Sequence, residues 1–340
     1  MAKTLMLAVA GSGKTTLLVD RLCADRRTLI LTYTNTNERN LRSAIIKRFG
    51  YHPKNISLFT YYTFLYSFCY RPLLSLKMGS AGINWLPNPD RFAKGDDQLV
   101  DRYGRLYSNR IALTLKRKNV LSEVKTRLER YFDQIFIDEV QDFAGNDFNF
   151  LDTLVSASLE QLFVGDFFQH TYDTSRDGNV NGTLHDDLQR YVARFESLGL
   201  RLDKKTLSKS HRCNPEICAF VEEQLGITIG SHRSGGSSII HISSAADAAV
   251  LFRDNSVVKL FYQAHYHYDC YSKNWGESKG EDRYQDVCVV MNGKTWKSFQ
   301  DGELKGLPSQ TRSKLYVALT RTKGNLYLLP ESLLKQFKKK

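Results

Sequence analysis

Short apolar runs alternate with amphipathic stretches along the first part of the chain, and the same alternation returns beyond residue 130. The apolar runs that predict strands are 5–9, 28–32, 56–59, 135–137 and 162–164. The amphipathic stretches that predict helices are 14–23 and 38–49. Strands that alternate with helices are typical of a parallel α/β sheet, so we expect one such lobe to comprise residues 1–70 and 131–199.

Residues 71–130 break this rhythm. Gly, Pro and Asn gather at 79–90, and a basic helical pattern follows up to residue 130, which predicts a small, mainly helical insertion. A second α/β lobe is expected over 200–340. Its predicted elements are a helix after Pro215, strands at 239–242, 287–291 and 326–329, and a helix at 310–318.

The net charge points to a kind of partner. With 42% hydrophobic residues, a chain of 340 residues can bury more than one ordinary core. Lys and Arg number 48 against 36 Asp and Glu, a net charge of +12, which favours nucleic acid or an anionic membrane surface. No apolar run approaches the roughly 20 residues that cross a bilayer. The six cysteines form no CxxC pair, so we expect reduced thiols, a cytoplasmic location and no membrane partner.

A glycine loop follows the first predicted strand and precedes the first predicted helix. Its residues Gly11, Ser12 and Gly13 let backbone N–H groups close around phosphates. Lys14 would reach the β- and γ-phosphates, and Thr15 would ligate Mg²⁺. The full pattern has Gly where Ala8 stands here, and a structural glycine turn is the alternative. The residues predicted to bind the nucleotide are Ala10, Gly11, Ser12, Gly13, Lys14, Thr15 and Thr16.

An acidic pair follows the apolar run 135–137. Asp138 is expected to hold Mg²⁺, and Glu139 to orient or deprotonate the water that attacks the γ-phosphate. Acidic residues also begin ordinary turns, so the pair alone is weak evidence for a nucleotide site. The glycine loop upstream strengthens this prediction.

The segment Asp138-Glu139-Val140-Gln141-Asp142 resembles the DExQD box of UvrD/Rep-like superfamily 1 helicases. Further segments resemble other boxes of that family in the same order, from residue 8 to residue 323. These are the loop at 8–15, TYTN at 32–35, TYYTF at 60–64, GDFFQHTY at 165–172, the segment ending in SHR at 207–212, SKGED at 278–282 and YVALTRTK at 316–323.

This resemblance implies two RecA-like lobes with ATP between them. It makes Arg212 and Arg321 the arginines that stabilise the γ-phosphate, with surface ion pairs as the alternative. It makes Gln169 the sensor of that phosphate. The remaining nucleotide contacts implied are His211, which would stack on adenine, and the segment of Gly280 and Asp282, which would meet the ribose.

The same resemblance implies contacts with single-stranded DNA. Thr34, Asn35 and Thr63 would bind phosphates. Tyr62, Phe64 and Tyr172 would stack on bases, with core packing as the alternative for all three. The alternating aromatic run 262–275 predicts a strand rather than a stacking surface.

Some features depart from the family pattern. No glutamine motif precedes the loop, so ATP is inferred from the resemblance alone. The stretch after Tyr172 differs, with Arg176 displaced by one position. Between residues 222 and 272 there is room only for a short linker, so the large 2B insertion of the second lobe is absent, and a protein partner could supply unwinding activation or a nuclease.

The sequence therefore predicts an ATP- and Mg²⁺-dependent translocase on single-stranded DNA, with 3′–5′ helicase activity. A nucleotide-gated nucleic-acid clamp with little motor output is one alternative, and an RNA-directed motor is another.

Overall fold

The structure, a computed structural model, describes residues 2–79, 81–171 and 180–339. The chain divides into two compact units. The described residues of the first unit are 2–6, 14–79, 81–165 and 180–203. Those of the second unit are 7–13, 166–171 and 204–339, so the glycine loop groups with the carboxy-terminal part of the chain.

A six-stranded sheet with the strand order β3-β2-β6-β7-β1-β8 forms the centre of the first unit. Its strands are β1 (Lys3–Leu7), β2 (Thr28–Thr32), β3 (Ile56–Thr60), β6 (Gln134–Ile137), β7 (Glu160–Gly165) and β8 (Arg201–Asp203). β2 lies parallel to both β3 and β6, and every residue of β2 and β6 is buried. Continuous apolar runs of this kind form strands that are covered on both faces.

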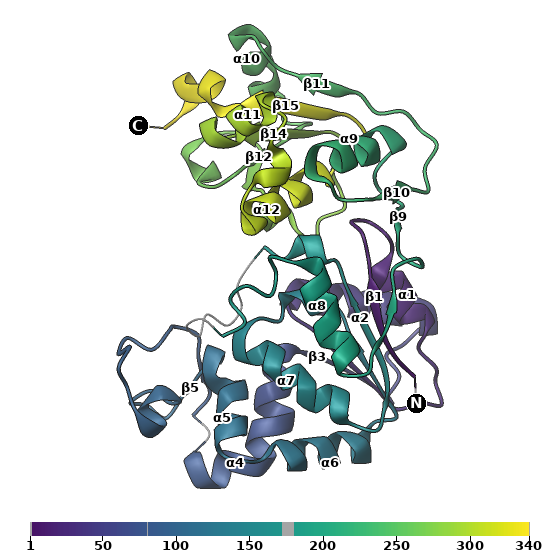
Figure 1. The fold of residues 1–340 in the computed structure, drawn as a ribbon, viewed down its shortest axis with the longest axis vertical. Coiled ribbons are helices and arrows are strands. Elements are labelled where there is room, and N and C mark those ends of the chain that lie inside the picture. The colour runs from purple at the N-terminus through teal and green to yellow at the C-terminus, as the bar shows by residue number, and fades with distance from the viewer. Residues whose placement is uncertain (1, 80, 172–179, 340) are drawn as a thin grey trace. The chain divides into compact units, whose positions relative to one another are not determined.

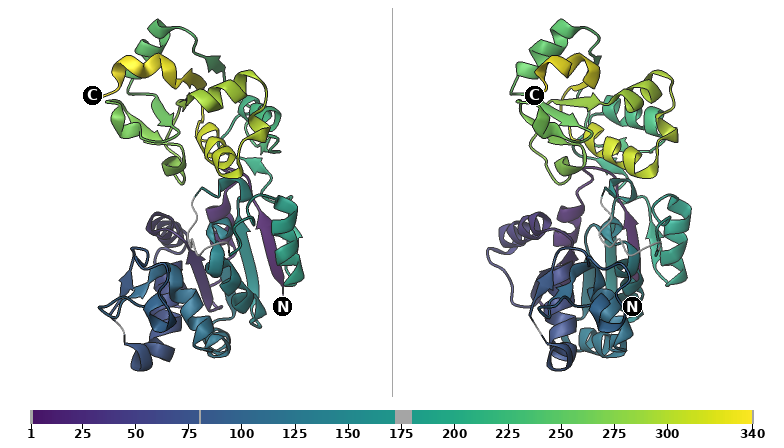
Figure 2. Two further views of the ribbon diagram at one scale, coloured as in Figure 1. Left: turned by 60° about the vertical axis from the view of Figure 1, so that its left-hand side comes forward. Right: turned by 90° about the vertical axis from the view of Figure 1, so that its left-hand side faces the viewer.

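Helices lie on both faces of this sheet (Figures 1 and 2). They are α1 (Lys14–Asp20), α2 (Asn35–Phe49), α7 (Gly145–Ser156) and α8 (Leu188–Ser197). α2 begins three residues before the predicted start because the Thr34 hydroxyl accepts a hydrogen bond from the Asn37 amide at 3.1 Å. It ends at Gly50, whose left-handed backbone (φ 79°) closes the last turn.

The insertion follows β3 through a short helix α3 (Tyr61–Thr63) and a π-helix at Phe64–Tyr70. Its helices are α4 (Arg71–Met78), α5 (Ile111–Arg117) and α6 (Leu121–Tyr131), with 3-10 turns at Gly95–Gln98 and Ser108–Arg110. Two short parallel strands, β4 (Ile83–Asn84) and β5 (Leu106–Tyr107), complete it.

The second unit is built on a five-stranded sheet in the order β11-β15-β14-β12-β13. Its strands, all paired in parallel, are β11 (Ile239–His241), β12 (Val258–Phe261), β13 (Ser272–Asn274), β14 (Val287–Met291) and β15 (Leu326–Pro330). The flanking helices are α9 (Pro215–Leu225), α10 (Ala245–Arg253), α11 (Gly293–Gln300) and α12 (Ser309–Leu319), and β9 (Lys209–Ser210) pairs with β10 (Gly230–Ser231).

Alternate residues of β14 enter two separate apolar cores, one on each face of this sheet. Val287, Val289 and Met291 pack in the cluster that contains α9 and α12 residues. Cys288 and Val290 pack in the cluster that contains α10 residues. This period-two burial confirms the predicted class, two parallel α/β sheets with a small helical insertion.

The predicted strand over 262–275 is largely wrong. The backbone turns at Ala264 (φ 58°), a 3-10 turn follows at His265–His267, and only Ser272–Asn274 pairs with β12. Tyr268 and Trp275 are buried, whereas Tyr266 is 66% exposed, so the aromatic alternation does not correspond to the two faces of a strand. Among the residues that the structure describes, no helix is long and apolar enough to cross a membrane.

A tight contact at the end of β7 generates a first prediction. A Cβ atom at Gly165 would overlap the Gln141 amide oxygen and lie 2.8 Å from Val140 Cγ1. We expect Gly165→Ala to destabilise the fold by about 1–3 kcal/mol, measured as a lower midpoint of thermal unfolding. Gly236→Ala is the control, because its Cβ would meet no atom within 4 Å. Equal midpoints for the two variants would contradict the packing described.

Candidate nucleotide site

The glycine loop lies directly against the segment that ends in Ser210-His211-Arg212, both within the second unit. The His211 amide donates to the Gly11 carbonyl at 2.8 Å. A Cβ atom on Gly11 (φ 70°) would lie 2.7 Å from Arg212 Cβ and 2.8 Å from Ser210 Oγ. Glycine is therefore required at this position by its backbone angle and by the close approach together.

The rest of the loop has graded exposure. Ser12 is buried, Lys14 and Thr15 are half-buried and Thr16 is exposed. Ala8 is buried and keeps an ordinary backbone angle, so alanine fits where the full pattern has glycine.

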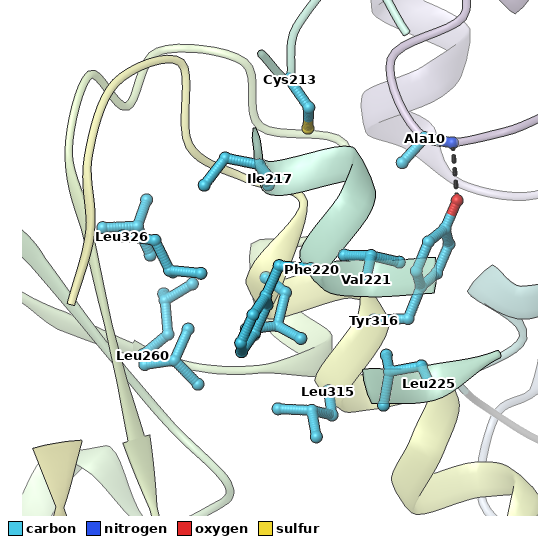
Figure 3. Close-up of a cluster of buried hydrophobic side chains, with 14 of the residues drawn as sticks. Ala10, Cys213, Ile217, Phe220, Val221, Leu225, Leu260, Leu315, Tyr316 and Leu326 are labelled. Atoms are coloured by element: carbon cyan, nitrogen blue, oxygen red, sulfur yellow. Dashed lines mark hydrogen bonds between the residues drawn. The ribbon is translucent and has the colours of Figure 1, made fainter. Parts of the chain in front are cut away.

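A buried tyrosine hydroxyl joins the loop to two other predicted segments. Tyr316 of α12 accepts a hydrogen bond from the Ala10 amide at 2.9 Å (Figure 3). The same hydroxyl donates to Asp166 Oδ2 at 3.1 Å, and the Gln169 amide donates to that oxygen at 2.8 Å. Burial and the Asp166 carboxylate raise the pKa of Tyr316, so it stays a neutral donor. The Ala10 amide thus donates its hydrogen bond to another group of the protein, Tyr316.

The two predicted arginines are both buried in the second unit. Arg212 is 8% exposed, donates to the Thr320 carbonyl at 3.0 Å and forms an ion pair with Asp282. Arg321 is 1% exposed and donates to the carbonyls of Val317 at 3.2 Å and Glu281 at 3.2 Å. Burial and the neighbouring Arg212 lower the pKa of Arg321 to about 10, while Asp282 opposes the shift. Its guanidinium therefore remains charged at neutral pH.

Asp282 has a partner that the sequence did not predict. Partial desolvation by the neighbouring protein raises its pKa, but Arg212 and Arg321 outweigh that effect and hold the pKa below its usual range. Its side chain is 70% exposed, so the ion pair contributes little to stability and mainly orients Arg212. Gly280, two residues earlier, adopts φ 83°. The predicted ribose contact of this segment stays a prediction.

His211 lies beside the end of the glycine loop. Its ring stacks on His232 at 4.2 Å with an angle of 12° between the planes. A Cβ atom on Gly13 would lie 3.7 Å from His211 Cδ2. His211 and His232 are both exposed, so the imidazole stack offers a flat face close to the predicted phosphate site.

The first unit contains the predicted lysine and the predicted catalytic carboxylate. Lys14 Nζ lies 3.4 Å from Glu139 Oε1, and each side chain is 12% exposed. The Gln141 amide donates to the other oxygen of Glu139. Glu139 has φ 54° and ψ 46°, a left-handed conformation that costs a non-glycine residue energy and is frequent at functional sites.

The predicted magnesium ligands are oxygen donors of the kind that this ion prefers. Asp138 follows β6 and is 3% exposed, and Thr15 lies in the first turn of α1. Mg²⁺ commonly takes only one or two protein oxygens and completes its shell with phosphates and water. The donor set therefore fits the ion.

The predicted nucleic-acid contacts in the first unit divide into exposed and buried groups. Thr34, Asn35 and Thr63 are exposed, and Tyr62 is half-buried with its hydroxyl 2.6 Å from that of Tyr33. Phe64 is fully buried and stacks on Phe68, so the core-packing alternative describes it and its ring offers no face to a base. Tyr172 lies outside the described residues.

Sequence reasoning missed one aromatic residue near these contacts. Trp85 of the insertion meets the Tyr62 ring edge-to-face with 5.1 Å between ring centroids, and it is 63% exposed. The available signal was a tryptophan standing alone in the Gly-, Pro- and Asn-rich stretch 79–90. The Tyr316 hydroxyl was also missed, because its partners come from distant parts of the chain.

Similar solved structures come from arteriviruses. The structure of arterivirus nonstructural protein 10, a helicase, in complex with DNA is 14% identical, with a TM-score of 0.51, and the match covers 98% of this chain and 63% of that one. A crystal structure of arterivirus nonstructural protein 10 gives 14% identity, a TM-score of 0.51, and coverage of 98% and 62%. The chain has a helicase fold.

This helicase fold spans less than two thirds of the length of the nonstructural protein 10 chains. No protein-family model matches the chain. No curated protein matches it either. At 14% identity this likeness establishes the fold alone. The evidence about activity comes from the sequence motifs.

The position of Tyr316 generates a second prediction. Tyr316→Phe removes a partner from the Ala10 amide and from Asp166, both buried. Asp166 keeps its bond from Gln169, but leaving the buried Ala10 amide unsatisfied costs about 1–3 kcal/mol, so we expect a lower thermal midpoint and weaker binding of a fluorescent ATP analogue. Tyr266→Phe, at a residue that is 66% exposed, controls for loss of a hydroxyl. If both variants bind the analogue as the wild type does, Tyr316 does not support the loop.

Proposed function

We propose that the chain is an ATP-dependent translocase on single-stranded DNA, of the UvrD/Rep-like superfamily 1 type, that unwinds duplex DNA with 3′–5′ polarity. The helicase fold and the ordered series of motifs support this proposal. The observation that carries it is the meeting of distant segments at the glycine loop, where Gly11 contacts Ser210 and Arg212 and Ala10 bonds Tyr316. A merely structural glycine turn gives no reason for these segments to converge there.

The residues suggest a division of labour in hydrolysis. Lys14 would exchange its partner Glu139 for the β- and γ-phosphates, which frees the Glu139 carboxylate to orient and deprotonate water. Gln141 would keep that carboxylate in position through its hydrogen bond. Mg²⁺ held by Thr15 and Asp138 would neutralise phosphate charge.

The arginines would supply the remaining positive charge. Arg321 is protonated at neutral pH, and the Arg212 guanidinium lies close enough to lower its pKa. A guanidinium aimed at the γ-phosphate stabilises the charge that develops in the transition state. The bond from Gln169 to Asp166, and from Asp166 to Tyr316, would report the phosphate state to the loop.

The proposed nucleic-acid contacts are not specific for sequence. Hydroxyl and amide groups of Thr34, Asn35 and Thr63 suit phosphate oxygens, and the net charge of +12 favours a polyanion. Comparing ATPase stimulation by single-stranded DNA, duplex DNA and RNA separates a DNA motor from an RNA motor. Strand displacement on duplexes with a 3′ or a 5′ overhang tests the polarity, and only the 3′ overhang should support it.

The second candidate function is a nucleotide-gated clamp with little motor output. The existing contacts of the two arginines favour it, because guanidinium groups that are already bonded are less available to a γ-phosphate. Arg321 is 1% exposed and bonded to backbone carbonyls, and Arg212 is paired with Asp282. A clamp would bind single strands more tightly with a non-hydrolysable ATP analogue and displace no strand at any protein concentration. Displacement that requires ATP hydrolysis would exclude it.

Glu139 provides the third prediction. We expect Glu139→Gln to lower the single-strand-stimulated ATPase rate by about 10²–10⁴-fold, because an amide cannot accept the proton of water. Nucleotide binding should be retained, since the phosphates would no longer compete with the Glu139 carboxylate for Lys14. Glu196→Gln, at an exposed residue of α8, is the matched control. An unchanged rate in Glu139→Gln would remove this carboxylate from the mechanism.

A further inference from the structure

The insertion of the first unit presents a large aromatic side chain to solvent. Trp85 directly follows β4 and is 63% exposed. An exposed indole leaves a large apolar surface in water, and tryptophan is enriched at binding interfaces. Trp275 is fully buried and Trp296 is half-buried, so neither presents its ring in this way.

The backbone around Trp85 is fixed by hydrogen bonds on both sides. The Asn84 side chain accepts from the Leu86 amide at 3.0 Å and donates to Asp101 Oδ2 at 2.9 Å. Asp101 in turn accepts from Arg105 Nε at 2.8 Å, and β4 pairs with β5. The indole is thus held in place before any ligand arrives, which lowers the entropic cost of binding.

The indole is also positioned by packing against another ring. Trp85 meets Tyr62 edge-to-face at 5.1 Å and 88°. Tyr62 is held by the hydroxyl of Tyr33, and the Tyr33 ring packs against buried Phe143. This aromatic group is therefore anchored in the core of the first unit, while Trp85 itself is 63% exposed.

Groups suited to a phosphate backbone stand next to these rings in the chain. Thr34 follows Tyr33, and Thr63 follows Tyr62, at the carboxyl ends of β2 and β3. Both threonines are exposed. An aromatic face bordered by hydroxyl groups has the composition of a surface that binds single-stranded nucleic acid.

We propose that Trp85 stacks on a base of the single strand on which this protein moves. The proposal rests on the proposed function and names a contact of the same nucleic-acid site. It assigns to the insertion a base contact that the buried Phe64 cannot make. Because every base has a π-face, such a contact binds single strands of any sequence, which a translocase requires.

Equilibrium binding of a fluorescent oligothymidylate gives the direct test. We expect Trp85→Ala to raise the Kd about tenfold, equivalent to about 1.4 kcal/mol, and to raise the DNA concentration that half-stimulates the ATPase by the same factor. Trp85→Phe should retain most of the affinity, and Leu86→Ala, at a neighbour that is 72% exposed, should bind as the wild type does.

A strand with abasic sites isolates stacking from backbone contacts. The wild type should bind this strand about tenfold more weakly than the normal strand, whereas Trp85→Ala should bind the two with similar affinity. DNA should also quench tryptophan fluorescence in the wild type and much less in Trp85→Phe, because Trp85 is the most exposed tryptophan.

The outcomes separate the two proposals. If the wild type binds the oligothymidylate and Trp85→Ala binds it as tightly as Leu86→Ala does, the stacking role is wrong and the proposed function stands. If the wild type binds no single-stranded nucleic acid, the proposed function fails and the stacking role fails with it.

Discussion

The second unit depends on the close approach of the glycine loop to the segment Ser210-His211-Arg212. Gly11 leaves no room for a Cβ atom, and the Tyr316 hydroxyl completes the loop by bonding Ala10. A buried hydroxyl that both accepts and donates serves two polar groups at once. Removing it would leave the Ala10 amide without this partner, whereas Asp166 would keep its bond from Gln169. The Tyr316 hydroxyl also bonds Asp166, which accepts from Gln169, so hydrogen bonds connect the glycine loop to both residues.

Charge compensation is the second constraint. Arg212 and Arg321 are buried near each other, and Asp282 together with backbone carbonyls compensates them. Lys14 and Glu139 compensate each other in the first unit. Buried charges persist only when they are paired, so a triphosphate that offers new anionic partners would displace existing ones. This exchange gives a physical reason for nucleotide binding to change the state of the protein.

In the first unit, the residues predicted to bind nucleotide and nucleic acid follow the carboxyl ends of the parallel strands. Lys14 belongs to the helix that follows β1, Thr34 caps the helix after β2, and Asp138 and Glu139 follow β6. Ligands of open α/β sheets bind at this edge because the loops there begin helices and leave side chains free to point outward. The insertion adds Trp85 to the same unit through Tyr62, which follows β3.

The sequence by itself determined the fold class and most elements, because burial on both faces leaves continuous apolar runs such as β2 and β14. It failed over 262–275, where a turn interrupts the alternating aromatics and only some of them, such as Tyr268, reach the core. The residues of the candidate site were readable as motifs, but their partners were not. That Tyr316 bonds Ala10, that Asp282 pairs with Arg212, that Phe64 is buried and that Trp85 is exposed were decided by the tertiary structure. These contacts join residues far apart in the chain, and local pattern records only which face of an element is apolar, not which distant group will meet it.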